Sequence, residues 1–412
     1  MRRILKSLPV IGIAAIISVA GAQTAVAADE PQTATTAAIA KVLQVPEGTT
    51  VPTLTFAHDV KAVSVDDVAA TPTNMPGISL ADMTIDGTEK NQSTKNGVTT
   101  YYVESLDILK DVTFSHAGTY VYTVTERATT NGQFDTDTIH HTLTYSNESY
   151  KLTVYVVNTD SGLGVGAAIV ETDKGKVTAT PGGSQKDGGH SGMAFVSTYV
   201  HTNGPADPDN PNPTKESTLA ISKAVKGDLS SDKQYFNFTV KLSAPALVTN
   251  LPEYYRAYVM DATGVISPSN NGAASLLGQD LGDNKFSFIK VSASGPTVFT
   301  LKHGQKLVFV DTPTGTSYEV SEITPTSYEP SLVVTTNAVA AKSIVGEKDE
   351  TLASGQQLVG ESTNTAAFTN NRTLVTPTGL SVSAAPFIGF VGLAILGLAA
   401  YVVVKSRMRA HG

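Results

Sequence analysis

The stretch LTYSNESYKLTVYVV, from Leu143 to Val157, decides the fold class of the chain. It is rich in Thr, Tyr and Val and alternates in patches between apolar and polar residues, which is typical of half-buried β-strands. Tyr235–Leu242 (YFNFTVKL) and Lys306–Val310 (KLVFV) have the same character. Turn clusters such as Asp160-Ser161-Gly162 and Thr314-Gly315 punctuate these stretches. No amphipathic helix pattern stands out between the chain ends, so we expect an all-β protein.

A proline-rich segment divides the chain into two parts. Between His201 and Ser217 four prolines lie among Asp, Asn and Gly, and such a segment can form neither a helix nor a central strand. The chain is also longer than one hydrophobic core usually supports. We therefore expect two tandem immunoglobulin-like β-sandwich domains, residues 32–200 and 218–373, joined by a stiff linker at 201–217.

The N-terminal end predicts export. Basic residues at 2, 3 and 6 precede an apolar run from Leu8 to Ala20, and Ala25-Val26-Ala27 follows. This order is typical of a secretory signal peptide, so we expect residues 1–27 to be removed.

The C-terminal residues 375–412 have the layout of a cell-wall sorting signal. Val375-Thr376-Pro377-Thr378-Gly379 precedes an uncharged, mostly apolar run from 380 to 404, and three basic residues follow. The run is long enough to cross a bilayer of about 30 Å as a helix, with the basic tail in the cytoplasm. A plain tail anchor would need no Pro-Thr-Gly before the span. A sortase, a transpeptidase, would cut between Thr378 and Gly379.

Composition excludes several functional classes. The chain has no Cys and a formal net charge of −8, so we expect no disulfide and no nucleic-acid partner. His140 and His141 are adjacent and point to opposite faces of a strand, which disfavours joint metal binding. Asp207-Pro208-Asp209 lacks the further ligands of a calcium loop. No phosphate-binding loop or nucleophile elbow is present, so we expect no metal, no cofactor and no turnover enzyme.

The two halves share three landmarks in the same order. These are Ile39-Ala40-Lys41-Val42 with Ile221-Ser222-Lys223-Ala224, then Tyr122-Thr123-Val124-Thr125-Glu126 with Tyr318-Glu319-Val320-Ser321-Glu322, and finally Ala194-Phe195-Val196-Ser197 with Ala367-Phe368-Thr369-Asn370. Alternate residues of a strand share a face, so a Glu two residues after a core Val faces the core as well. The repeat therefore predicts one buried Lys and one buried Glu in each domain.

Burial favours the neutral forms of both groups. A neutral Lys223 amine can attack the Asn370 carboxamide while protonated Glu322 moves protons, and ammonia leaves. The product is a Lys–Asn isopeptide bond. The alternative is an exposed Lys–Glu pair of little energetic value at the rim of each sandwich. Two copies of the pattern favour the cross-link.

Together these motifs resemble a Gram-positive backbone (major) pilin of the streptococcal T-antigen type, built from pilin isopeptide-linkage domains. The matching segments are residues 39–43, 46–50, 219–227, 300–305, 315–322, 368–370 and 375–379. The resemblance implies that sortase holds Thr378 as a thioester and passes it to a Lys of the next subunit, which gives a covalent head-to-tail fibre. The implied partners are a pilin-type sortase, identical subunits, peptidoglycan and host surface ligands. The implied location is a secreted, wall-anchored surface pilus.

The first domain departs from the family pattern. Ser197 stands where the family has Asn, so Lys41 has no amide to attack there. We expect Lys41 and Glu126 to form an uncross-linked buried pair, and Asn158 or Asn203 would be the alternative acceptor. Val375-Thr376 replaces the commoner Leu-Pro of the sorting motif, which leaves the particular sortase open.

The sortase acceptor is expected late in the first domain. Lys186 lies in a Gly-rich loop that is suited to enter an enzyme cleft, and Lys174 and Lys176 are the alternatives. Each of these three lysines is also explained as an ordinary surface residue that is exposed to solvent. Two other functions are open: a wall-anchored adhesin or minor or basal pilin with the same domains, and a wall-anchored hydrolase. The hydrolase is disfavoured because no catalytic constellation is present.

Overall fold

A computed structural model describes residues 34–129, 131, 137–182, 190–205, 207, 209–248, 252–266, 277–279, 286–340 and 343–373. Every regular element in these ranges is a β-strand, so the expected all-β fold is confirmed. No helix in the described ranges is long and apolar enough to span a membrane. The expected signal peptide and sorting signal, with Thr378 and Gly379, lie outside the described residues.

Two sheets make up the first half. One has the strand order β5-β6-β1-β12-β8, and the other has the order β11-β10-β9-β7-β2-β3 with β4 paired to β2. The strands of the first sheet are β1 (Ile39–Pro46), β5 (Gln92–Lys95), β6 (Val98–Glu104), β8 (His141–Thr144) and β12 (Met193–His201). Those of the second are β2 (Leu54–Val65), β3 (Val68–Ala69), β4 (Met83–Ile85), β7 (Gly118–Arg127), β9 (Ser149–Thr159), β10 (Gly162–Thr172) and β11 (Gly175–Val177).

The second half repeats this plan with two sheets of its own. The larger has the order β16-β17-β15-β19-β13-β26-β21-β22, with β23 paired to β21, and the smaller has the order β18-β14-β20-β24, with β25 paired to β20. The larger contains β13 (Leu219–Lys226), β15 (Tyr254–Met260), β16 (Leu277–Gln279), β17 (Ser287–Ser292), β19 (Lys306–Phe309), β21 (Glu329–Thr336), β22 (Val339–Ala340), β23 (Ile344–Val345) and β26 (Thr365–Asn371). The smaller contains β14 (Phe236–Ser243), β18 (Pro296–Leu301), β20 (Ser317–Ile323), β24 (Leu352–Ala353) and β25 (Gln357–Leu358).

In each half the first long strand pairs in parallel with the last. β1 pairs with β12, and β13 pairs with β26, whereas the other pairings are antiparallel. β1 is covered on its other side by β6, and β13 by β19. Both strands are therefore central, and their inward side chains lie within the hydrophobic cores. A lysine on the inward face of such a strand has no route to water.

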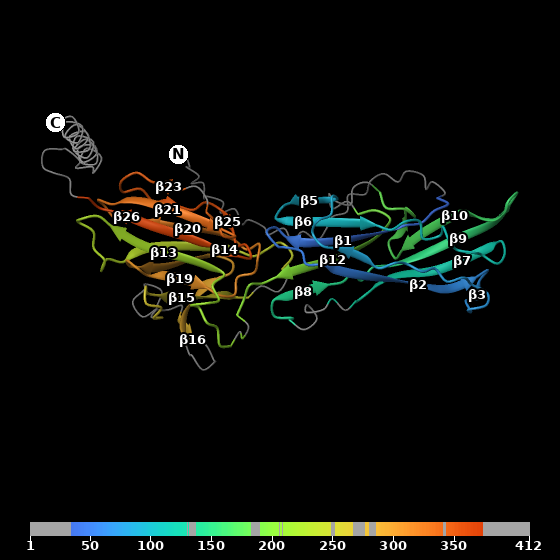
Figure 1. Ribbon diagram of the computed structural model, residues 1–412, viewed down its shortest axis with the longest axis horizontal. Helices are drawn as coiled ribbons and strands as arrows, with labels where there is room; N and C mark the ends of the chain where they lie inside the picture. Colours follow the sequence, from blue (N-terminus) through green and yellow to red (C-terminus); the bar gives the residue numbers. More distant parts are fainter. Residues whose placement is uncertain are drawn as a thin grey trace, which may run out of the picture.

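The two halves lie end to end (Figure 1), and Glu361 of the second half binds the first half at the junction. Its Oε1 accepts hydrogen bonds from the Thr50 N–H at 2.7 Å and from His201 Nδ1 at 3.1 Å, and its backbone oxygen accepts from Asn203. Burial alone would raise the pKa of Glu361, but the hydrogen bonds from His201 and Thr50 lower it below its usual value. Glu361 is therefore a charged acceptor that links the two halves.

A glycine permits the close approach at the same junction. Gly315 has φ +82°, and a Cβ at this position would lie 2.7 Å from the Pro46 Cβ and 3.1 Å from the Glu47 oxygen. Any other residue would therefore push the two halves apart and strain its own backbone.

Replacing Glu361 with Ala should lower the free energy of unfolding by about 1 kcal/mol at neutral pH, because the Thr50 N–H and the half-buried His201 ring lose a charged acceptor. The folded-state pKa of Glu361 is depressed, so this stabilisation is complete above the unfolded pKa near 4.5 and is lost as pH falls through the folded pKa. Calorimetric unfolding at pH 7 and pH 3 tests this. Glu329→Ala is the control, because this exposed carboxylate lies opposite Asn371, at the end of β26 that is far from Glu361. An equal effect of Glu361→Ala at both pH values would contradict the assignment.

Candidate isopeptide sites

The second half brings Lys223, Glu322 and Asn370 into contact inside its core. Lys223 on β13 and Asn370 on β26 come from one sheet, and Glu322 comes from β20 of the facing sheet. Glu322 Oε1 lies 2.6 Å from Lys223 Nζ and 2.6 Å from Asn370 Nδ2. The three residues are 2 % exposed or less. Sequence reasoning had placed these residues together, and the structure does so.

Burial at this site favours uncharged groups. The Phe236 ring lies 4.2 Å from Lys223 Nζ and keeps water from that side of the amine, although the ring face itself would attract an ammonium. Burial lowers the pKa of Lys223 to about 8, although the neighbouring Glu322 opposes this shift. Burial likewise raises the pKa of Glu322, against the influence of Lys223 and Asn370. Both directions move the pair toward a neutral amine and a neutral carboxylic acid, which is the state in which an amine is nucleophilic.

The geometry supports proton transfer between the reacting groups. Because Glu322 Oε1 contacts both nitrogens, one carboxyl oxygen can accept the proton of the amine and return it to the departing amide nitrogen. Glu322 Oε2 and Asn370 Oδ1 are buried without a hydrogen-bond partner among the described residues. If the Asn370 amide is turned over, its carbonyl oxygen faces Glu322 Oε1, where a protonated carboxyl would polarise it.

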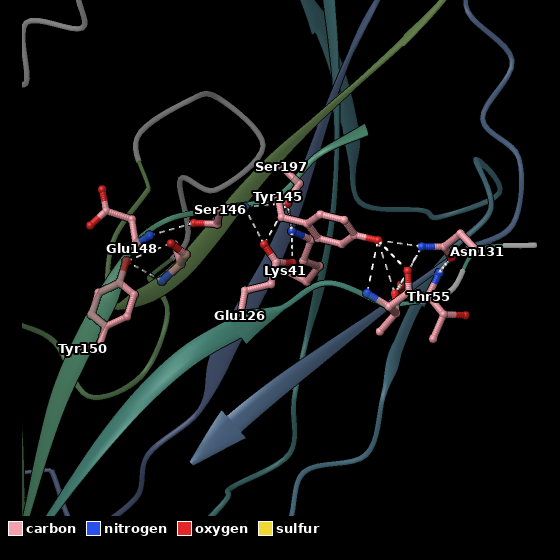
Figure 2. Close-up of polar contacts among 11 residues, drawn as sticks. Lys41, Thr55, Glu126, Asn131, Tyr145, Ser146, Glu148, Tyr150 and Ser197 are labelled. Carbon is pink, nitrogen blue, oxygen red and sulfur yellow. Dashed lines mark hydrogen bonds and ion pairs between the residues drawn. The ribbon is translucent and has the colours of Figure 1, made fainter. Parts of the chain in front are cut away.

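The first half holds the related set Lys41, Glu126 and Ser197 (Figure 2). Lys41 Nζ pairs with Glu126 Oε1 and donates to Ser197 Oγ, and Ser197 Oγ donates to Glu126 Oε2 at 2.8 Å. The Lys41 and Glu126 side chains are both fully buried. Burial lowers the pKa of Lys41 to about 8, while Glu126 opposes the shift. The predicted buried pair is therefore present, with a hydroxyl in place of the amide.

One contact of this site has no counterpart among the described residues of the other half. The Ser146 N–H donates to Glu126 Oε2 at 2.6 Å and to Ser197 Oγ at 3.1 Å. A neighbouring network holds this segment, because the Tyr145 hydroxyl accepts from Asn131 Nδ2 at 2.9 Å and donates to the Thr129 oxygen at 3.0 Å (Figure 2). Glu126 thus contacts the Lys41 amine and accepts hydrogen bonds from the Ser197 hydroxyl and the Ser146 N–H.

His58 is a second feature that sequence reasoning missed. It lies opposite Glu126 in the β2–β7 pairing, is 8 % exposed, and neither of its ring nitrogens has a partner among the described residues. Burial, helped by the charge of Lys41, lowers its pKa to about 4, against the influence of Asp59. The alternation of Leu54, Phe56 and His58 along β2 is the signal that could have identified it as a core residue.

The other predicted residues lie away from Lys41. Asn158 is exposed near the end of β9, and Asn203 binds Glu361 at the junction, so the structure brings neither alternative acceptor to the amine. Lys174 and Lys176 are exposed around the β10–β11 turn, and Lys174 Nζ lies 3.9 Å from Glu148. Lys186 lies outside the described residues.

The histidines of the junction do not assemble a metal site. His140 bonds to Asp137 at 2.7 Å, whereas the His141 ring stacks on His201 with centroids 4.8 Å apart. Within the described ranges, no three His, Asp or Glu side chains are arranged to hold a metal ion.

Comparison with protein families gives a separate match for each half. Residues 38–199 match the Spy0128-like isopeptide containing domain, and residues 217–372 match a domain of unknown function (DUF7601). The complete Lys–Glu–Asn set therefore lies in the half that matches the domain of unknown function.

Known proteins with similar sequences are streptococcal. A pilin of Streptococcus pyogenes serotype M1 is 25% identical over 298 residues, which are 72% of this chain and 70% of that pilin. The pilus tip adhesin Cpa of Streptococcus pyogenes is 29% identical over 163 residues, 40% of this chain but only 18% of the adhesin.

Solved structures were also compared. The major pilin of Streptococcus pyogenes aligns over 83% of this chain and 100% of its own, with 19% identity and a TM-score of 0.33. The major pilin T3.2 of Streptococcus pyogenes aligns over 82% of this chain and 99% of its own, with 17% identity and a TM-score of 0.30. By its sequence matches, this chain carries a member of the Spy0128-like isopeptide containing domain family at residues 38–199 and is a relative of streptococcal pilins.

Proposed function

We propose that the chain is the structural shaft subunit of a covalently polymerised surface pilus, stabilised internally by an isopeptide bond between Lys223 and Asn370. The observation that carries the proposal is the buried contact of Glu322 Oε1 with both nitrogens of this pair. The Lys223 amine attacks the Asn370 side-chain carbonyl carbon, a C–N bond forms, the bond to Nδ2 breaks, and ammonia leaves with the proton that Glu322 transfers. The step occurs once per molecule, so the chain is not a turnover enzyme.

The bond would restrain nearly the whole second half. It closes a loop from β13 to β26, which run side by side through the centre of the larger sheet. By analogy with a disulfide, closing a loop of this length removes about 5 kcal/mol of unfolded-chain entropy. Since the chain contains no Cys, an amide cross-link supplies a covalent restraint that reducing agents cannot break.

Polymerisation is proposed to use the C-terminal motif. A pilin-type sortase cuts between Thr378 and Gly379, holds Thr378 as a thioester, and transfers it to a Lys amine of the next identical subunit. The last subunit is transferred to peptidoglycan, which places the fibre on the cell wall. Domain boundaries at residues 32–200 and 218–373, with the linker at 201–217, are part of this proposal. The family matches at residues 38–199 and 217–372 support these boundaries. Three of the four domain ends lie within one residue of a match, and the start of the first domain lies six residues before its match.

An adhesin or a minor or basal pilin is the second candidate, because a pilus tip adhesin is among the relatives. The match reaches only 18% of that adhesin, whereas the pilin match covers 70% of the pilin. The described residues are accounted for by the two β-structured halves and the segment that joins them. Host surface ligands are the partners that this second function would require.

The recombinant chain from Ala28 to Thr378 should weigh about 17 Da less than its calculated mass, one ammonia, because, of the two lysines buried among the described residues, only Lys223 lies beside a carboxamide. Intact-mass spectrometry measures the deficit, and tandem spectra should join Lys223 to Asn370. Asn370→Ala and Glu322→Ala should abolish the deficit, whereas Ser197→Ala should keep it. A full calculated mass in the unsubstituted chain would exclude the bond, and a deficit of two ammonia molecules would show that Lys41 found another acceptor.

Lys186→Arg should prevent polymerisation by the cognate sortase, because Arg keeps the charge but cannot act as the nucleophile. Incubation of the chain carrying its sorting motif with that sortase, followed by denaturing electrophoresis, measures the ladder of covalent polymers. Lys174→Arg and Lys176→Arg are matched controls that should polymerise normally. If one of these two substitutions removes the ladder and Lys186→Arg leaves it intact, the acceptor is the substituted residue.

A further inference from the structure

We propose that Lys41 and Glu126 form a latent isopeptide site that Ser197 keeps silent, so that the first half lacks only an acceptor carbonyl. In the natural chain this half is held by an ion pair and can unfold reversibly, while the second half is covalently closed. The inference rests on the proposed chemistry of the second half, since it transfers that chemistry to a second set of residues.

The strand register places Ser197 at the position of the second site's acceptor. Lys41 lies opposite Phe195 in the parallel β1–β12 pairing, and Ser197 lies two residues further along, opposite Leu43. In the β13–β26 pairing, Lys223 lies opposite Phe368, and Asn370 lies two residues further along, opposite Val225. The backbone therefore presents residue 197 to Lys41 with the same offset as it presents Asn370 to Lys223.

The environment of the amine is also the same in both halves. Lys41 Nζ lies 4.2 Å from the Phe56 ring, and Lys223 Nζ lies 4.2 Å from the Phe236 ring. Each amine pairs with a fully buried carboxyl of the facing sheet. The nucleophile and the proton-transferring group are thus already in place in the first half.

Ser146 would assist an acceptor at position 197. Its N–H now reaches both Glu126 Oε2 and Ser197 Oγ, so an amide oxygen at residue 197 would receive the same donor. Such a donor stabilises the negative charge that develops on the carbonyl oxygen during attack. Asn370 Oδ1 has no equivalent donor among the described residues. The first site therefore has one catalytic contact more than the second.

The two sites differ at one further inward position. His58 lies opposite Glu126, whereas Phe238 lies opposite Glu322. Changing Ser197 to Asn together with His58 to Phe would copy the second site at both positions. This double substitution also removes two buried ring nitrogens that lack partners in the described part of the chain.

The test is the intact mass of Ser197→Asn in the chain from Ala28 to Thr378. We expect a deficit of about 34 Da from the variant's own calculated mass, one ammonia more than in the unsubstituted chain, with tandem spectra that join residues 41 and 197. Ser197→Asn combined with Lys41→Arg is the matched control and should show no further loss, because the guanidinium stays protonated and is not nucleophilic. Adding Glu126→Gln to Ser197→Asn should slow or abolish the reaction.

Circular dichroism and cooperative thermal unfolding establish that each variant is folded. If Ser197→Asn alone does not fold, Ser197→Asn with His58→Phe is measured instead. A folded variant without the further loss, after prolonged incubation at pH 8, overturns the proposal. The reaction of the first site is measured alone in a chain that also carries Asn370→Ala, which removes the acceptor of the second site. In that chain, Ser197→Asn should still lose one ammonia. A loss there, with none in the unsubstituted chain, would support the latent site and reject the proposed Lys223–Asn370 bond.

Discussion

The parallel pairing of the first and last strands of each half is the constraint on which the rest of the structure depends. It places a lysine in the middle of a central strand, two residues out of register with the acceptor position on its neighbour. A buried ammonium without a partner is very costly, and removing one member of a buried ion pair typically costs about 3–5 kcal/mol. The facing sheet must therefore supply a carboxyl, and β7 and β20 each do so with a Glu.

Under the proposed chemistry, the same arrangement would have two outcomes, because the third residue differs. Asn370 offers a carbonyl carbon and a leaving group, and Glu322 is left with an unpartnered oxygen, which suits a neutral acid. Ser197 offers only a hydroxyl, and Ser146 adds a further hydrogen-bond donor to Glu126. A single hydroxyl thus changes a site poised for condensation into a hydrogen-bonded ion pair.

Much of this arrangement could be predicted from the amino-acid sequence, because alternate residues of a β-strand point to the same face of the sheet. The Tyr-x-Val-x-Glu repeat correctly placed Glu126 and Glu322 in the cores, and the matching landmarks paired them with Lys41 and Lys223. The Ser146 contact could not be predicted, because it is made by a backbone N–H that any residue carries. Glu361 was missed for a related reason: its partners, Thr50 and His201, belong to the other half, and no local pattern shows which loop reaches across a junction.

The order of events during folding follows from the requirements of the reaction. The amine becomes nucleophilic only when burial lowers its pKa, and burial exists only after the two sheets have packed. The proposed cross-link therefore cannot guide folding, and the second half must first be stable through its core alone. The first half must rely on noncovalent stability permanently, because Lys41 and Glu126 form an ion pair and no covalent bond. Both cores are accordingly filled with Phe, Tyr, Leu and Val, although only one has an acceptor amide. The proposed bond would prevent loss of a fold that packing has already produced.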